Sequence, residues 1–116
     1  MSLLAELNTF TGTSQYDKAS PLYNLNLTDG TKYLAEKTGC YWLIDIVGSY
    51  QGEPKVKAEG FQVWKLKVND DKSAVVTCED GNYNEIIRQD IPFTDFPLKE
   101  ISVWVQNGVC FLPSEY

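Results

Sequence analysis

Residues 28–47 read TDGTKYLAEKTGCYWLIDIV, and this segment carries the clearest helix signals of the chain. Thr28 or Asp29 is placed to cap a helix that runs to about Thr38, where Gly39 can adopt the left-handed conformation that ends a helix. A second helix follows at once, with a wide apolar face formed by Trp42, Leu43, Ile46, Val47 and Tyr50. We therefore expect a helix–glycine–helix pair whose second member packs into the core.

The sequence on either side of this pair predicts helices first and strands afterwards. Leucines at helical spacing predict a short peripheral helix over residues 2–10, and residues 23–27 alternate as a half-buried strand does. From Gly60 onward the apolar period is 2, which predicts strands separated by turns at 69–72, 79–82 and 107–108. The expected strands lie near 64–68, 74–78, 86–87, 101–105 and 109–112, and Pro92 and Pro97 make their segment a loop or edge. The predicted class is α+β, with N-terminal helices packed on an antiparallel β-meander.

Length and composition bound the possibilities further. A chain of 116 residues with 43% hydrophobic and 13% aromatic residues can bury a core without metals or disulfides. We expect one soluble globular domain over residues 1–116. The start of the chain has no basic region followed by an apolar run, which predicts a cytoplasmic protein with no membrane span. Cys40, Cys78 and Cys110 are widely spaced, and they are expected to be reduced thiols in the core.

The charge of the chain disfavours anionic partners. A formal net charge of -6 does not supply the excess of basic residues that contacts to phosphates need, so neither nucleic acid nor an anionic membrane is an expected partner. The helix pair does not change this, because its second helix is apolar and lacks base-reading side chains. Four lysines form a local cluster that either solvates an exposed strand face or makes a small anionic contact: Lys55, Lys57, Lys65 and Lys67.

The residues that common enzymes need are missing. The chain has no histidine, which removes the usual general base and the most frequent zinc ligand. The cysteines lack paired C-x-x-C spacing, and Cys78 is followed by Glu79 and Asp80, whose charges disfavour its thiolate. Residues 80–85 alternate oxygen ligands but fit a hairpin turn better than a calcium loop, and no phosphate-binding loop occurs. We expect no catalytic residue, no metal and no cofactor.

Six short motifs carry a resemblance that spans nearly the whole chain. They are FTGT (10–13), TDG with YLAE (28–36), YWLID (41–45), TCEDGN (77–82), TDFPL (94–98) and LPSEY (112–116). In this order they resemble a family of small uncharacterised bacterial proteins that also occurs on phages and plasmids. The resemblance implies a cytoplasmic single-domain protein of prokaryotic or mobile-element origin, and it transfers no activity, cofactor or site residue. Cys40 stands where that family has a small residue.

Asp45 is the polar position that the sequence singles out. Its neighbours on the second helix are apolar, and a buried carboxylate there costs several kcal/mol unless it finds donors. Two interpretations are open: an exposed aspartate on the polar edge of the helix, or a carboxylate that lines a pocket with Tyr33, Trp42 or Asp29. The candidate binding residues are Asp29, Tyr33, Trp42 and Asp45 from this pocket, together with Asp80 and Asp95, which a site built from carboxylates would use.

Two functions of different classes fit these observations. The first is a non-catalytic protein-interaction module, such as an accessory or counter-defence factor of a mobile element, with Trp64 and Trp104 either as anchors or as ordinary core. The alternative is a small-ligand binding domain or an enzyme that uses only carboxylates. A concave pocket that unites two carboxylates favours the alternative, whereas a flat and patchy surface favours the module. Mimicry of nucleic acid is a weaker third idea, because the acidic excess is modest.

Overall fold

The computed structural model describes residues 17–18, 25–82 and 84–115, and it confirms the α+β class. Its strands are β1 (Asp17–Lys18), β2 (Asn26–Leu27), β3 (Phe61–Val68), β4 (Ala74–Glu79), β5 (Glu85–Ile91), β6 (Glu100–Gln106) and β7 (Val109–Phe111). Its helices are α2 (Asp29–Thr38), α3 (Tyr41–Ser49) and the short α4 (Pro54–Lys57), with 3-10 turns η1 (Tyr50–Gly52) and η2 (Pro113–Glu115). The helix expected over residues 2–10 lies outside the described residues, as do residues 23 and 24 of the expected strand 23–27.

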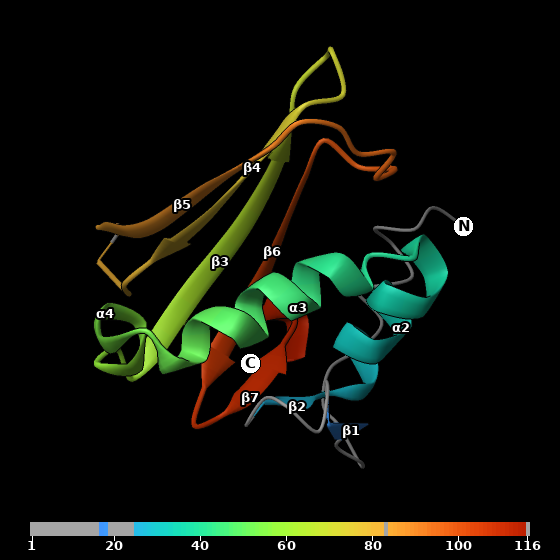
Figure 1. Cartoon of the computed structure of the whole chain (residues 1–116). Coiled ribbons are helices and arrows are strands. Elements are labelled where there is room, and N and C mark those ends of the chain that lie inside the picture. The colour runs from blue at the N-terminus through green and yellow to red at the C-terminus, as the bar shows by residue number, and fades with distance from the viewer. Residues whose placement is uncertain (1–16, 19–24, 83, 116) are drawn as a thin grey trace.

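The helix pair forms as its sequence predicts. Thr28 is the N-cap of α2, and its side chain accepts a hydrogen bond from the backbone N–H of Thr31. Gly39 ends the helix with a φ of 71°, a left-handed conformation that glycine adopts at no steric cost. α3 begins two residues later, and Figure 1 shows both helices on the same side of the sheet. The helical part then extends through η1 and α4, because Pro54 at the first position of α4 is compatible with a new helix.

In the residues that the structure describes, the sheet has seven strands in the order β1-β2-β7-β6-β3-β4-β5. β3, β4 and β5 form the expected meander, and β6 and β7 form a hairpin whose turn holds Asn107 and Gly108 at φ values of 54° and 74°. The expectation of one antiparallel meander needs correction in two respects. β6 pairs with β3 instead of β5, so the connection after β5 passes from the edge of the sheet back to its interior. β2 pairs with β7 in parallel, which makes the sheet mixed.

Side chains on the strands alternate between two faces. The face toward the helices is buried, and on β3 and β4 it is formed by Trp64, Leu66, Ala74, Val76 and Cys78. Trp64 is only 1% exposed, which assigns it to the core. Trp104 lies on the other face, half-buried and in edge contact with Phe61 and Phe111 at centroid distances of 5.3 and 6.2 Å.

The expected lysine cluster is divided by the fold. Lys55 and Lys57 lie on α4, whereas Lys65 and Lys67 lie on β3. Lys65 forms an ion pair with Glu79 on the neighbouring strand at 3.3 Å. The four lysines therefore do not share one strand face.

Within the described residues, no helix is both long enough and apolar enough to cross a membrane.

Candidate functional site

In the connection between β5 and β6, alternate side chains point to opposite sides. Thr94 and Phe96 are buried, with exposed fractions of 5% and 4%, whereas Phe93 is 68% exposed and Asp95 is also exposed. Two hydrogen bonds hold this segment: the Thr94 N–H donates to the Lys72 carbonyl at 2.8 Å, and the Phe96 N–H donates to Thr94 Oγ1 at 3.2 Å. The inward residues thus fix the position of Phe93 and Asp95 at the surface.

The outer face of α3 supplies the opposite part of the site. Leu43, Ile44 and Val47 point into the core, so helical geometry turns Trp42, Asp45 and Ile46 the other way. Trp42 and Ile46 are half-buried and pack against the edge of the core, while Asp45 is exposed. An apolar surface formed by Trp42 and Ile46, with the Asp45 carboxylate beside it, therefore faces the β5–β6 connection.

Together these segments enclose an open recess of about 560 Å³, which we call the α3 recess. Its lining consists of Trp42, Asp45, Ile46, Ile91, Phe93, Thr94 and Asp95. Four of these residues are large and apolar, and the two carboxylates come one from each segment. In the described part of the chain, neither the Asp45 nor the Asp95 carboxylate has a hydrogen-bond or ion-pair partner. The recess is therefore an apolar surface with two carboxylates that the fold does not use.

Three of the six predicted binding residues meet in the α3 recess, and three do not. Trp42, Asp45 and Asp95 line it, and the Asp45 side chain is exposed at its border. Asp29 and Tyr33 lie on α2, outside the recess lining. Asp80 belongs to the turn between β4 and β5. The structure thus divides the predicted set according to where each segment packs.

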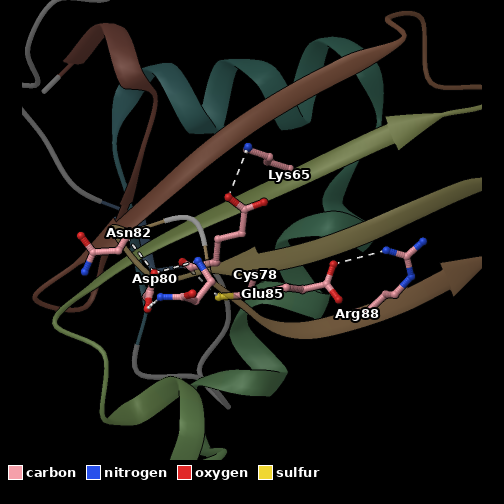
Figure 2. A network of polar contacts seen from close by, with 8 residues as sticks. Lys65, Cys78, Asp80, Asn82, Glu85 and Arg88 are labelled. Carbon is pink, nitrogen blue, oxygen red and sulfur yellow. Dashed lines mark hydrogen bonds and ion pairs between the residues drawn. The ribbon is translucent and has the colours of Figure 1, made fainter.

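Asp80 organises its own turn (Figure 2). Its Oδ1 accepts hydrogen bonds from the backbone N–H groups of Asn82 and Asn84 at 2.8 and 3.0 Å, and its Oδ2 accepts one from Asn84 Nδ2 at 2.9 Å. These bonds favour the ionised form, so they lower the pKa of Asp80, with the Asn84 side chain as the largest cause. The hairpin-turn interpretation of residues 80–85 is confirmed, and Asp80 has a structural role there.

The cysteines are free and buried, as expected of core thiols. Burial, together with the nearby carboxylates Glu59, Glu79 and Asp80, raises the pKa of Cys78 to about 12. Burial likewise raises the pKa of Cys110 to about 12 and shifts that of Cys40 upward. A nucleophilic cysteine needs the opposite shift, because the thiolate is the reactive form. Among the described residues, no group of three or more cysteine and carboxylate side chains is arranged to hold a metal ion.

A larger groove of about 710 Å³ lies between the end of α3 and the β6–β7 turn, but its polar floor is already satisfied. Gln51 and Gln62 pair their amides at 2.9 and 3.2 Å, and Trp64 Nε1 donates to Gln62 Oε1 at 2.9 Å. Gln51 and Gln62 also donate to the carbonyls of Val47 and Val56. Because the amide donors are used within the protein, this floor serves to bury Gln62 and Trp64 and offers few groups to a ligand.

Four residues of the recess were not among the predicted binding residues, namely Ile46, Ile91, Phe93 and Thr94, and Phe93 is the most exposed of them. It follows Pro92 in a segment with no clear period, so neither helical nor strand spacing assigned it a face. The two prolines indicated a surface connection, but they do not distinguish the exposed Phe93 from the buried Phe96 in the same segment.

The chain belongs to a family of unknown function, DUF6876, whose family model matches residues 1–116. This confirms the resemblance to an uncharacterised family. No curated protein and no solved structure matches the chain.

Proposed function

We propose that this protein is a non-catalytic protein-interaction module and that the α3 recess is its binding surface. The observation that carries the proposal is Phe93, a large aromatic side chain that is 68% exposed at the edge of an apolar recess. Exposing such a ring in the free protein is unfavourable, and clustered aromatic residues of this kind supply much of the energy in protein interfaces. Trp42, Ile46 and Ile91 extend the apolar surface around it.

The shape of the recess supports a macromolecular partner over a small ligand. Ligand sites bury most of the molecule they bind, which requires walls that enclose it. Here one wall is formed by a ring that is itself mostly exposed, and both bordering carboxylates are exposed too. A convex side chain of a partner protein covers such a surface, whereas a free metabolite would remain largely in solvent.

The wider proposal concerns the setting of the interaction. We propose a cytoplasmic protein that binds a host protein as an accessory or counter-defence factor of a mobile element. The three free, buried cysteines support a reducing compartment. The net charge of -6 supports a partner other than nucleic acid.

The test uses the wild-type protein and two variants as bait in the native host, followed by mass spectrometry. The partner identified is then purified and its affinity is measured by calorimetry. Phe93→Ala should weaken binding by about tenfold or more, as expected for a hot-spot ring. Tyr41→Ala is the matched control, because it removes a ring that is 46% exposed on α3 and outside the recess lining. Equal affinity of wild type and Phe93→Ala for the partner would refute this surface.

The alternative, a small-ligand site or a carboxylate-only enzyme, is favoured by one observation. The recess is concave and unites Asp45 with Asp95, which is the feature expected of that alternative. Paired carboxylates act as acid and base only where their environments differ, and here both side chains are exposed. A metabolite that co-purifies with the wild type and is lost from Asp45→Asn with Asp95→Asn would replace the interaction module by this second function.

A further inference from the structure

The two carboxylates of the α3 recess indicate the charge of what binds there. Asp45 and Asp95 line the recess from α3 and from the β5–β6 connection, and neither carboxylate has a hydrogen-bond or ion-pair partner in the described part of the chain. A neutral apolar partner would bury both charges without compensation, which is costly. A cationic group placed between them would instead gain charge-assisted hydrogen bonds.

The aromatic residues of the recess favour the same kind of group. Trp42 and Phe93 both line the cavity, and the faces of such rings attract ammonium and guanidinium groups. Guanidinium groups also stack on aromatic rings and bind carboxylates in a fork geometry. Ile46 and Ile91 complete the apolar lining, which matches the methylene stem of a long basic side chain.

We infer that the α3 recess binds a cationic side chain, an arginine or a lysine, that belongs to a basic segment of the partner protein. This inference rests on the proposed function and adds the chemistry of the partner. The volume of about 560 Å³ falls within the roughly 300–1,000 Å³ of ordinary binding pockets, so it accommodates one such side chain together with neighbouring residues of the segment. The net charge of -6 also attracts a basic segment before contact.

Nuclear magnetic resonance of the indole N–H groups tests the inference on the intact protein. Three probes are titrated: acetyl-Gly-Arg-Gly-amide, its neutral analogue with citrulline in place of arginine, and agmatine. We expect the arginine tripeptide to shift the Trp42 indole signal saturably, and to bind at least about tenfold more tightly than the citrulline tripeptide. Added sodium chloride should weaken the arginine complex, because exposed charges are screened.

Two double variants separate the recess from the overall charge. Asp45→Asn with Asp95→Asn should reduce the affinity for the arginine tripeptide at least about tenfold. Glu36→Gln with Glu53→Gln is the matched control, because it removes the same charge from exposed positions on α2 and before α4, and it should leave the affinity within about twofold.

Each contrary result overturns the inference. It fails if the arginine tripeptide produces no shift of the Trp42 signal, if citrulline binds equally well, or if the two double variants behave alike. Agmatine binding more tightly than the tripeptide would make the occupant a free cation instead of a partner segment. The proposed function fails separately, when a captured partner binds Phe93→Ala as tightly as wild type.

Discussion

The start of α2 and the outer face of α3 use carboxylates in opposite ways. At the start of α2, Glu115 Oε1 accepts hydrogen bonds from Thr28 Oγ1 at 2.6 Å and from the Leu112 N–H at 2.9 Å, and its Oε2 accepts one from the Gly30 N–H at 3.3 Å. The negative charge also lies at the positive end of the helix dipole. Glu115 thereby joins η2 to the first turn of α2.

Asp45 and Asp95 have no such donors in the described part of the chain, although each is equally able to accept them. Hydrogen-bond donors around the carboxylate therefore distinguish a structural carboxylate from an available one. Glu115 and Asp80 each satisfy their oxygens with donors from their own surroundings, so their charge is used by the fold. The carboxylates of the α3 recess are not used by the fold in this way.

The largest expected effect is at Phe96, which anchors the β5–β6 connection. Its side chain is 4% exposed and belongs to the core, so Phe96→Ala should lower the free energy of unfolding by about 3–5 kcal/mol. Urea denaturation measures this loss. A cost below about 1 kcal/mol would mean that the segment is not held by the core, and the fixed position of Phe93 would lose its basis.

Glu115→Ala should give the next largest effect. It leaves the Thr28 hydroxyl and the Gly30 and Leu112 N–H groups without their acceptor, so we expect a loss of about 2–3 kcal/mol in urea denaturation. Glu36→Ala is the control on the exposed side of α2 and should change the stability by less than about 0.5 kcal/mol. Equal effects of both variants would show that the C-terminal contact does not stabilise the helix.

Gly30→Ala should cost about 1–2 kcal/mol and should depend on Glu115. A Cβ atom at residue 30 would lie 2.7 Å from Glu115 Oε1 and 2.8 Å from Leu112 Cδ1, so both side chains must shift and the hydrogen bonds are strained. In the Glu115→Ala background, the steric clash between the new Cβ atom and the Glu115 side chain is removed. A double-mutant cycle measures the coupling, and strict additivity would contradict the close packing of η2 on α2.

Asp80 offers a test in acid. Because hydrogen bonds lower its folded-state pKa below the ordinary 3.8, the ionised side chain stabilises the protein above that value, and this contribution is lost as the pH falls through the folded-state pKa. Asp80→Asn should reduce stability near neutral pH and should approach the wild type at the acid end. Carboxyl carbon resonances measured against pH give the pKa directly, and a value at or above 3.8 would contradict the turn geometry.

The sequence predicted those parts of the fold that depend on near neighbours. Thr28, Gly39 and the Asn107–Gly108 turn act through residues a few positions away, so their caps and turns could be read directly. The pairing of β6 with β3 and the contact between Thr28 and Glu115, which are 87 residues apart, depend on how distant segments meet. No local sequence period indicates contacts between distant segments, and the prediction of a single meander was wrong for this reason.

The candidate site shows the same difference between local sequence signals and contacts of distant segments. Trp42 and Asp45 were identified because helical spacing showed which neighbours were apolar, and Asp95 because carboxylates were considered individually. That these three share one recess follows from the packing of the β5–β6 connection against α3, which the sequence did not indicate. Phe93 was missed for the same reason, since only the burial of its neighbours Thr94 and Phe96 turns it outward.

The smallest expected effect concerns the recess itself, and it separates stability from binding. Phe93→Ala, Asp45→Ala and Asp95→Ala alter exposed side chains, and the carboxylates have no partner in the described residues, so each should change the free energy of unfolding by no more than about 0.5 kcal/mol. Urea denaturation of the three variants checks this against Phe96→Ala. If Asp45→Ala instead cost about 3 kcal/mol, Asp45 would be a structural carboxylate like Glu115, because removing it would then leave buried donors unpaired. A nearly unchanged free energy of unfolding, combined with weaker binding, is the result that assigns these side chains to a partner.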